Sequence, residues 1–322
     1  MKKIIYSSVG KLIFLALIAF ILCGVYLTYN TYGNFSFAWQ IRGKKLFAFI
    51  LVAIATGFST ISFQTLTQNH FLTPSILGLD SLYVLIQTLL FFLFGGVTML
   101  SQQSLGLFLG TISLMVIASL FLSKFMLGKS QNDLFLLLMI GLILGTLFSS
   151  GSTFLQVLMD PNEYDLLQGK LFASFGNVDS QYLLWAAAII IGISAILFWL
   201  STTLDVLHLG REQAINLGIN LPRLQILLLV LISGLTGTAT ALVGPVTFLG
   251  FIVANISYQF MGTFKHRTLF VTSGLLGIIL LVGGQFLVEQ VFRLNTTLSV
   301  IIEFVGGVYF VGKLVYERKR HV

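Results

Sequence analysis

Residues 182–200 read YLLWAAAIIIGISAILFWL, and residues 221–235 read LPRLQILLLVLISGL. Between these apolar runs lies a polar stretch, residues 204–220, which reads LDVLHLGREQAINLGIN. An apolar run of about 18 or more residues crosses the hydrocarbon core of a bilayer, about 30 Å thick, as a single helix. Apolar runs of this kind, joined by short polar segments, predict an all-α, polytopic membrane protein.

The composition of the chain supports the same fold class. Its 322 residues are 57% hydrophobic and only 9% charged, with a formal charge of +7 at pH 7. A soluble domain carries roughly 25% charged residues, so these few charges do not cover a globular surface. We attribute the positive charge to cytoplasmic loops next to membrane lipid, where Lys and Arg collect, and not to nucleic-acid binding.

Ten membrane spans are expected, in a single domain that covers residues 1–322. Leu22 precedes the only cysteine, Cys23, where a lipoprotein cleavage site needs a small residue, so the first range is interpreted as an uncleaved span. The acidic segment 159–180 is expected to hold one short surface helix outside the membrane. The approximate spans are 11–29, 45–65, 81–97, 105–126, 134–158, 181–200, 223–241, 246–261, 268–288 and 298–316.

The distribution of basic residues predicts that both termini lie in the cytoplasm. With ten spans in this orientation, most of the 18 Lys and Arg residues fall on the cytoplasmic side, as they do in membrane proteins generally. The basic group at residues 42–45 falls outside and needs an explanation of its own. The basic residues predicted to be external are Arg42, Lys44, Lys45, Lys170 and Arg293.

The sequence offers little material for catalysis. Residues 307–314, GVYFVGKL, match the start of a phosphate-binding loop, but Leu314 stands where Ser or Thr would bind magnesium. We therefore expect Lys313 to extend toward the inner membrane interface. The histidines all fall in predicted cytoplasmic segments without metal-ligand spacing: His70, His208, His266 and His321.

One acidic side chain, Glu303, is predicted to lie within a span, while Asp80 is placed at a span end. Carboxylates inside a membrane are costly and usually functional. Glu303 therefore supports one alternative, an ion-coupled secondary transporter; otherwise it bonds a polar neighbour on another helix. A single carboxylate is a weak basis for a proton or sodium pump, which favours an energy source outside this chain.

The polar insert has the features of a short, rigid helix. Residues 211–217 are good helix formers, and Gly218 suits the left-handed conformation that ends many helices. Ala214 and Leu217 are three residues apart, which predicts a small apolar face. We call this insert, residues 204–220, the knob. On the cytoplasmic side it is shaped to dock in a groove of another protein.

The pattern L-G-x-x-x-A-x-x-L-G in this insert resembles the cytoplasmic coupling motif of the iron-siderophore (FecCD-type) permeases. These are membrane subunits of type II ABC importers, related to the vitamin B12 permease. The resemblance implies a bacterial cell-membrane permease, itself not an enzyme, that is coupled through residues 204–220 to a separate ATPase. No cofactor is expected on this chain, since ATP and Mg²⁺ would bind to the ATPase. The implied coupling residues are Leu209, Gly210, Arg211, Glu212, Ala214, Leu217 and Gly218.

Further matches follow in the order of the family. Residues 42–81 look like its second span and the following turn, and residues 244–256, GPVTFLGFIVANI, resemble the start of its eighth span. The hallmark positions of the first match are Gln64, Pro74, Leu77 and Gly78.

Three departures from the family pattern, at residues 253–256, 295–298 and 306–310, indicate a divergent branch. This branch resembles permeases for catecholate or petrobactin-type siderophores, in which two different permease chains pair. Cobalamin or haem as cargo, and a homodimer, are the alternatives within the same fold.

The resemblance also implies a partner outside the cell, a siderophore-binding protein. Arg42 and Lys45 match a basic pair of the family that binds acidic residues on this partner, and Arg293 lies in the other external region used in this way. Such charge pairs raise the encounter rate and set the orientation. Anchoring at the lipid surface is the alternative for Lys44 and Lys45. The polar candidates for lining the transport path are Gln64, Asn255, Gln285 and Glu303.

Overall fold

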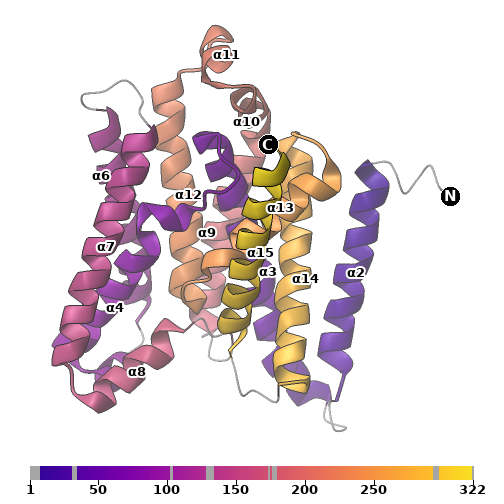
Figure 1. The fold of residues 1–322 in the computed structure, drawn as a ribbon. Helices are drawn as coiled ribbons and strands as arrows, with labels where there is room; N and C mark the ends of the chain where they lie inside the picture. The colour runs from indigo at the N-terminus through magenta and orange to yellow at the C-terminus, as the bar shows by residue number, and fades with distance from the viewer. Residues whose placement is uncertain are drawn as a thin grey trace.

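The computed structural model describes residues 8–30, 35–101, 104–127, 134–172, 175, 180–292 and 297–320. Within these residues the regular structure is helical throughout, and no strand is present. The helices, labelled as in Figure 1, are α2 Ser8–Thr28, α3 Phe35–Thr67, the 3₁₀ turn η1 Pro74–Leu77, α4 Leu79–Phe94, α5 Gly96–Ser101, α6 Leu105–Leu127, α7 Leu134–Leu158, α8 Pro161–Leu171, α9 Ser180–Trp199, α10 Ser201–His208, α11 Arg211–Asn216, α12 Leu221–Val243, α13 Thr247–Met261, α14 His266–Gln290 and α15 Leu298–Arg320.

Each predicted span coincides with one helix. Among the residues that the structure describes, eight helices are long and apolar enough to cross a membrane, namely α2, α3, α6, α7, α9, α12, α14 and α15. The other two, α4 and α13, have 16 and 15 residues. At 1.5 Å per residue they extend for about 24 Å and about 22 Å, less than a full hydrocarbon core. Both are short because a glycine with positive φ precedes them, Gly78 at 77° and Gly244 at 96°.

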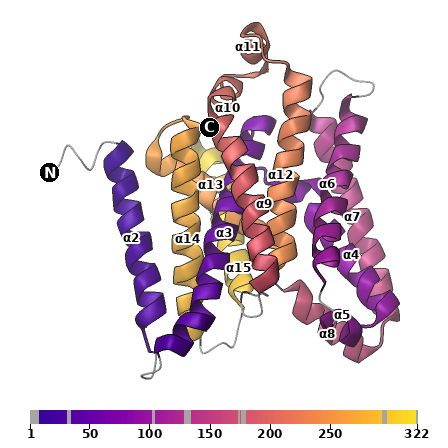
Figure 2. The same ribbon diagram turned by 180° about the vertical axis from the view of Figure 1, so that it is seen from behind.

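The helices form one bundle with two distinct ends. Figures 1 and 2 show α2 at one side, α4, α6 and α7 at the other, and α3 and α12–α14 between them. Of the long spans, α3 and α12 are the most buried and α2 the least. Helices α10 and α11 project from the end where the two termini of the chain lie, while α5 and α8 lie at the opposite end (Figures 1 and 2). With the charge bias of the sequence, this arrangement makes the α10–α11 end the cytoplasmic one.

Two pairs of glycines with the same spacing have different surroundings. A Cβ atom built at Gly141 would lie 2.9 Å from the carbonyl oxygen of Ile76, and one at Gly145 would lie 3.2 Å from the Cα of Gly78. This pair therefore lets α7 pack directly on the turn before α4. Added Cβ atoms at Gly106 and Gly110 would meet no atom closer than 3.8 Å. The spacing of two glycines four residues apart favours close helix packing, and the structure shows such packing at Gly141 and Gly145 but not at Gly106 and Gly110.

The predicted surface helix in segment 159–180 is α8. Pro161 occupies its first turn, and the carboxylate of Asp160 accepts a hydrogen bond of 3.0 Å from the backbone N–H of Asn162. Such N-terminal capping is worth about 1 kcal/mol. The carboxylate of Glu163 accepts a hydrogen bond from the backbone N–H of Gly96, the first residue of α5. These contacts fasten the two outer surface helices to each other.

Candidate coupling site and transport path

The projecting end of the molecule is built from α10, α11 and the turn after them. Gly210 and Gly218 have φ values of 117° and 86°, which side chains with a Cβ rarely adopt. The backbone N–H of Ile219 donates to the carbonyl of Ala214 at 3.0 Å, and that of Gly218 donates to Ile215 at 2.9 Å. This pair of bonds is the Schellman arrangement, so the left-handed cap predicted at Gly218 is confirmed. The helical region begins at Ser201, three residues before the predicted insert.

The apolar side chains of this knob divide into one buried residue and an exposed group. Ala214 is fully buried, so it packs inside the knob and not on its surface. Leu209, Ile215 and Leu217 are 57%, 53% and 64% exposed. We call these three residues the apolar tip. Since the tip lies beyond the membrane spans, it is a surface that another protein can cover. Glu212 is exposed beside it, and Arg211 is half-buried.

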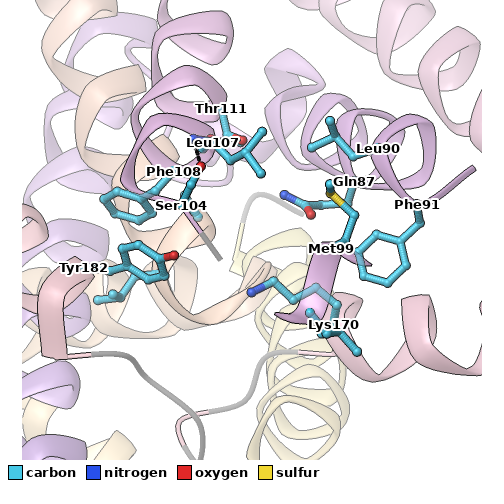
Figure 3. A pocket seen from close by; sticks show the side chains of 13 residues that line it. Gln87, Leu90, Phe91, Met99, Ser104, Leu107, Phe108, Thr111, Lys170 and Tyr182 are labelled. Carbon is cyan, nitrogen blue, oxygen red and sulfur yellow. Dashed lines mark hydrogen bonds between the residues drawn. The ribbon is translucent and has the colours of Figure 1, made fainter. Parts of the chain in front are cut away.

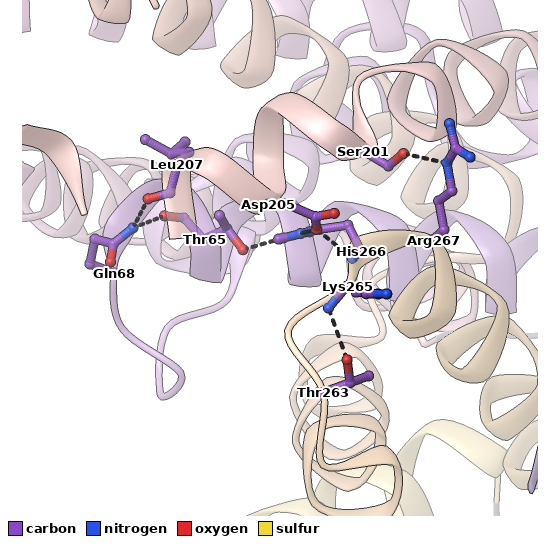
Figure 4. Close-up of polar contacts among 9 residues, drawn as sticks. All are labelled: Thr65, Gln68, Ser201, Asp205, Leu207, Thr263, Lys265, His266 and Arg267. Carbon is purple, nitrogen blue, oxygen red and sulfur yellow. Dashed lines mark hydrogen bonds and ion pairs between the residues drawn. The ribbon is translucent and has the colours of Figure 1, made fainter. Parts of the chain in front are cut away.

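A polar network, drawn in Figure 4, holds α10 against the membrane helices. The Oδ1 atom of Asp205 accepts from the backbone N–H of His266 at 2.7 Å and lies 2.6 Å from its Nδ1. The Nε2 of His266 lies 2.7 Å from the hydroxyl of Thr65. An ionised carboxylate can only accept hydrogen bonds, so the Nδ1–H of the neutral imidazole donates to Asp205. The unprotonated Nε2 then accepts a hydrogen bond from the Thr65 hydroxyl. The fully buried His266 ring thereby connects α10, α14 and α3.

Three further hydrogen bonds complete this connection, which we call the α10 seat. The amide of Gln68 donates to the carbonyl of Leu207 in α10 and to that of Thr65, each at 2.8 Å. The Nε of Arg267 donates to the hydroxyl of Ser201 at 3.1 Å (Figure 4). Both ends of α10 are therefore tied to the membrane bundle. The seat comprises Thr65, Gln68, Ser201, Asp205, Leu207, His266 and Arg267.

Sequence spacing did not predict that three histidines lie side by side here. The ring centroid of His208 lies 6.0 Å from that of His70 and 6.1 Å from that of His266. Burial lowers the pKa of the His208 imidazole, and the Asp205 carboxylate opposes this in part. Among the described residues no group of three or more His, Cys, Asp or Glu side chains is arranged to hold a metal ion. The rings pack against aromatic neighbours instead, such as Tyr258, 4.5 Å from His70. His321 lies outside the described residues.

At the opposite end lie the basic residues predicted to bind the binding protein. Two of them, Arg42 and Lys45, have partners within the chain. Arg42 donates to the carbonyl oxygens of Tyr26 and Tyr29 at 3.0 and 2.5 Å and so caps the end of α2. Lys45 forms an ion pair of 3.3 Å with Glu289, and the two side chains are only 19% and 13% exposed. Lys44 is the exposed cation of the group. Arg293 lies outside the described residues.

Two of the predicted path residues, Gln285 and Glu303, do not line the cavities of about 30, 70 and 800 Å³ that lie between the described helices. Gln285 donates to the Oε1 of Glu289 at 2.9 Å, next to the ion pair with Lys45. Glu303 is exposed on the surface of α15, where Phe304 is 73% exposed.

The carboxylate that the bundle encloses is Asp80, predicted at a span end. Its Oδ2 is buried without a hydrogen-bond partner among the described residues, beside a cavity of about 30 Å³ lined mainly by hydroxyl groups. The break at Gly78 starts α4 inside the bundle, which is why the sequence position was misleading.

The other two path candidates, Gln64 and Asn255, lie beside a large space. The amide of Gln64 donates to the backbone carbonyl of His70 at 2.7 Å, and the amide of Asn255 donates to the same carbonyl at 3.2 Å. They fix the loop after α3 against α13. Between this loop, α13 and α15 is a space of about 800 Å³, which we call the inner hollow. Asn255 lines it directly, whereas Gln64 supports the loop from behind.

A smaller cavity lies toward the outer end, between α4, α5, α6 and α9 (Figure 3). It measures about 70 Å³, and the side chain of Lys170 from α8 extends into it between Gln87 and Tyr182. Burial lowers the pKa of the Lys170 ammonium group. This cation therefore points into the bundle, although the sequence suggested only an external loop residue.

Comparisons with known proteins extend this description. A model of the FecCD transport family matches residues 12–316. The chain is 46% identical to the petrobactin import system permease protein YclO of Bacillus subtilis (strain 168), over 96% of this chain and 98% of that protein. It is 37% identical to the petrobactin import system permease protein FatC of Bacillus anthracis, over 86% of this chain and 78% of that protein. The solved structure of a metal-chelate type ABC transporter in an inward-facing conformation has the same fold, with a TM-score of 0.84 at 24% identity, over 96% of this chain and 99% of that chain.

Proposed function

Because the chain belongs to the FecCD transport family, we propose that it is a permease subunit of an ATP-driven importer that carries iron-siderophore chelates into the bacterial cell. It is a multi-pass protein of the cell membrane, and its family works with an ATPase, a substrate-binding protein and a second permease. The cargo we propose is a catecholate-type chelate such as ferric petrobactin. The observation that carries this proposal is the identity to a petrobactin permease over nearly the full length of both chains.

The geometry of the cytoplasmic end supports a coupling role for residues 204–220. The apolar tip offers a surface for the ATPase, and the α10 seat is stiff enough to pass a displacement into α3 and α14. Ala214, Gly210 and Gly218 would act by shaping the knob. Leu209 and Leu217 would contact the ATPase directly.

We propose further that the second permease is a different chain, as expected for the divergent branch that the motif departures indicate. The surfaces available for it include α7 and α15, where large apolar side chains such as Leu147 and Val308 are 61% exposed. At the outer end, Lys44 is exposed and forms no ion pair with any residue that the structure describes, which makes it a better candidate for binding-protein docking than Arg42 and Lys45.

Uptake by the reconstituted importer tests the proposal. Proteoliposomes that hold this chain, its ATPase and the second permease would be given the binding protein loaded with radiolabelled ferric catecholate chelate. We expect uptake that requires ATP inside the vesicles and that persists with an uncoupler. Uptake that stops with the uncoupler while ATP remains would contradict the proposal and favour ion coupling through Glu303. Uptake of cobalamin or haem in place of the chelate would assign a different cargo.

A further inference from the structure

The inner hollow has a composition that suits a particular kind of ligand. It lies at the cytoplasmic half of the bundle, and its volume of about 800 Å³ is within the range of small-molecule sites, about 300–1,000 Å³. Among the described residues that line it, none is acidic and Lys313 is the one with a permanent charge. The others are amides, such as Asn255 and Gln259, and aromatic side chains, such as Phe71 and Tyr309.

Lys313 does not extend to the membrane interface as the sequence predicts. Its ammonium group donates to the Oδ1 of Asn255 and lies 5.1 Å from the ring centroid of Phe71 and 6.0 Å from that of Phe251. An amide oxygen and an aromatic ring face both attract a cation. These contacts hold the positive charge at the wall of the hollow.

The surrounding wall is rigid and largely aromatic. The Phe251 ring contacts those of Tyr309 and Phe310, with centroids 5.9 and 5.1 Å apart. Phe71 packs on the same cluster, with its centroid 6.0 Å from that of Phe310. Asn255 holds the loop that carries Phe71 with its amide nitrogen and Lys313 with its amide oxygen. The charge and the rings are therefore positioned by a single side chain.

We propose that the inner hollow is a transient binding site for an anionic, aromatic metal chelate, with Lys313 as the residue that contacts its negative charge. This inference rests on the proposed function and adds a site and a basis for selectivity to it. A catecholate loses two protons when it binds iron, so ferric catecholate complexes carry net negative charge, whereas ferric hydroxamate complexes are neutral. A fixed ammonium group at the wall of this space favours the anionic complex. The catechol rings can stack on the aromatic side chains, and the amide of Gln259 can donate to the oxygens of the chelate.

Lys11 provides a matched control for Lys313. Its ammonium group also donates to an amide-type oxygen, the backbone carbonyl of Phe260 at 2.6 Å, and lies 5.4 Å from the ring centroid of the same residue. It belongs to α2 and does not line the hollow. Lys11→Gln therefore removes a cation of the same kind at the same end of the bundle, away from the proposed site.

The experiment measures chelate binding and uptake with the complete importer. Equilibrium binding of a soluble radiolabelled ferric catecholate and of a neutral ferric hydroxamate would be measured in nanodiscs without the binding protein. Lys313→Gln is expected to weaken catecholate binding about tenfold, the effect of losing one hydrogen bond to a charged group, and to leave hydroxamate binding unchanged. In proteoliposomes the same variant should lower the maximal rate of catecholate uptake and leave the KM for the loaded binding protein unchanged. Lys313→Arg should retain both activities, and Lys11→Gln should behave like the unaltered protein.

Other outcomes separate this inference from the proposed function. If the unaltered importer transports the chelate with ATP but Lys313→Gln binds and transports it equally well, the site is refuted and the importer function stands. If Lys313→Gln weakens the binding of anionic and neutral chelates equally, and Lys313→Arg does not restore it, Lys313 has only a structural role. If mass spectrometry finds an anionic phospholipid that Lys313→Gln loses while chelate binding is unchanged, the hollow is a lipid site and the inference is wrong. If the unaltered importer moves no chelate, the proposed function itself fails.

Discussion

Replacing Asp205 by Asn tests whether the α10 seat transmits force from the ATPase. The Oδ1 of Asp205 accepts two hydrogen bonds from His266, one from the backbone and one from the ring, and its side chain is 26% exposed. A hydrogen bond to a charged group contributes about 1.5–3 kcal/mol, against about 0.5–1.5 kcal/mol for a neutral one. Losing the charge should therefore weaken the two bonds by about 2 kcal/mol in total. This lowers the ratio of seated to unseated α10 by about 30-fold, since 1.4 kcal/mol corresponds to a factor of ten.

Two measurements on the reconstituted importer check this prediction. Backbone amides of α10 should exchange with solvent faster in Asp205→Asn, since local opening now costs less free energy. The number of chelates taken up per ATP hydrolysed should fall several-fold, because the ATPase still moves the knob but less of the displacement reaches the bundle. Asp165→Asn, the same change at an exposed position of α8, should leave both quantities unaltered. Unchanged exchange and an unchanged ratio in Asp205→Asn would refute the reasoning.

Three further predictions concern the knob, the outer cations and helix packing. Ile215→Glu should abolish co-purification of the ATPase without lowering the unfolding temperature, whereas Ala214→Asp should lower that temperature as well because it buries a charge; equal stability of the two variants would contradict this. Lys44→Glu should weaken capture of the binding protein at low salt, measured by surface plasmon resonance, and the effect should shrink as salt is added. Lys45→Glu should instead destabilise the permease, because it places a second carboxylate beside the first of its ion pair. Gly277→Val should lower the free energy of unfolding by about 1–3 kcal/mol in thermal denaturation, since a Cβ there would lie 2.8 Å from a Cβ of α3.

The sequence predicted correctly those features that depend only on a continuous segment of the chain. Apolar length predicted the spans, and the glycines at 210 and 218 predicted the knob, because hydropathy and backbone conformation are local quantities. It was uninformative about which polar side chains meet. Asp205 and His266 are 61 residues apart, and Lys45 and Glu289 are 244 apart, so no spacing rule connects them.

Some residues were misjudged because their surroundings, and not their type, decide their role. Lys313 was assigned to the membrane interface from its place near a helix end, but Asn255 and the ring of Phe71 hold it in the bundle. Lys45 was assigned to docking from a family pattern, yet its charge pairs with Glu289. Ala214 was placed on the docking face from its spacing to Leu217, although a helix of only six residues, Arg211–Asn216, turns it inward. For the two lysines the deciding partner comes from another part of the chain.

The position of α3 suggests how the cytoplasmic and inner sites act together. At its inner end Thr65 and Gln68 belong to the α10 seat, and Gln64 holds the loop that forms one wall of the inner hollow. Near its middle it packs closely on α14, since a Cβ at Gly57 would lie 2.6 Å from the hydroxyl oxygen of Ser273. Two helices this close cannot slide independently without a clash, so they should move as one body. A displacement of α10 by the ATPase would then shift the wall of the hollow relative to α15, which carries Lys313. We therefore expect the affinity of the hollow for its ligand to change with the nucleotide bound to the ATPase, and Asp205→Asn to weaken that change.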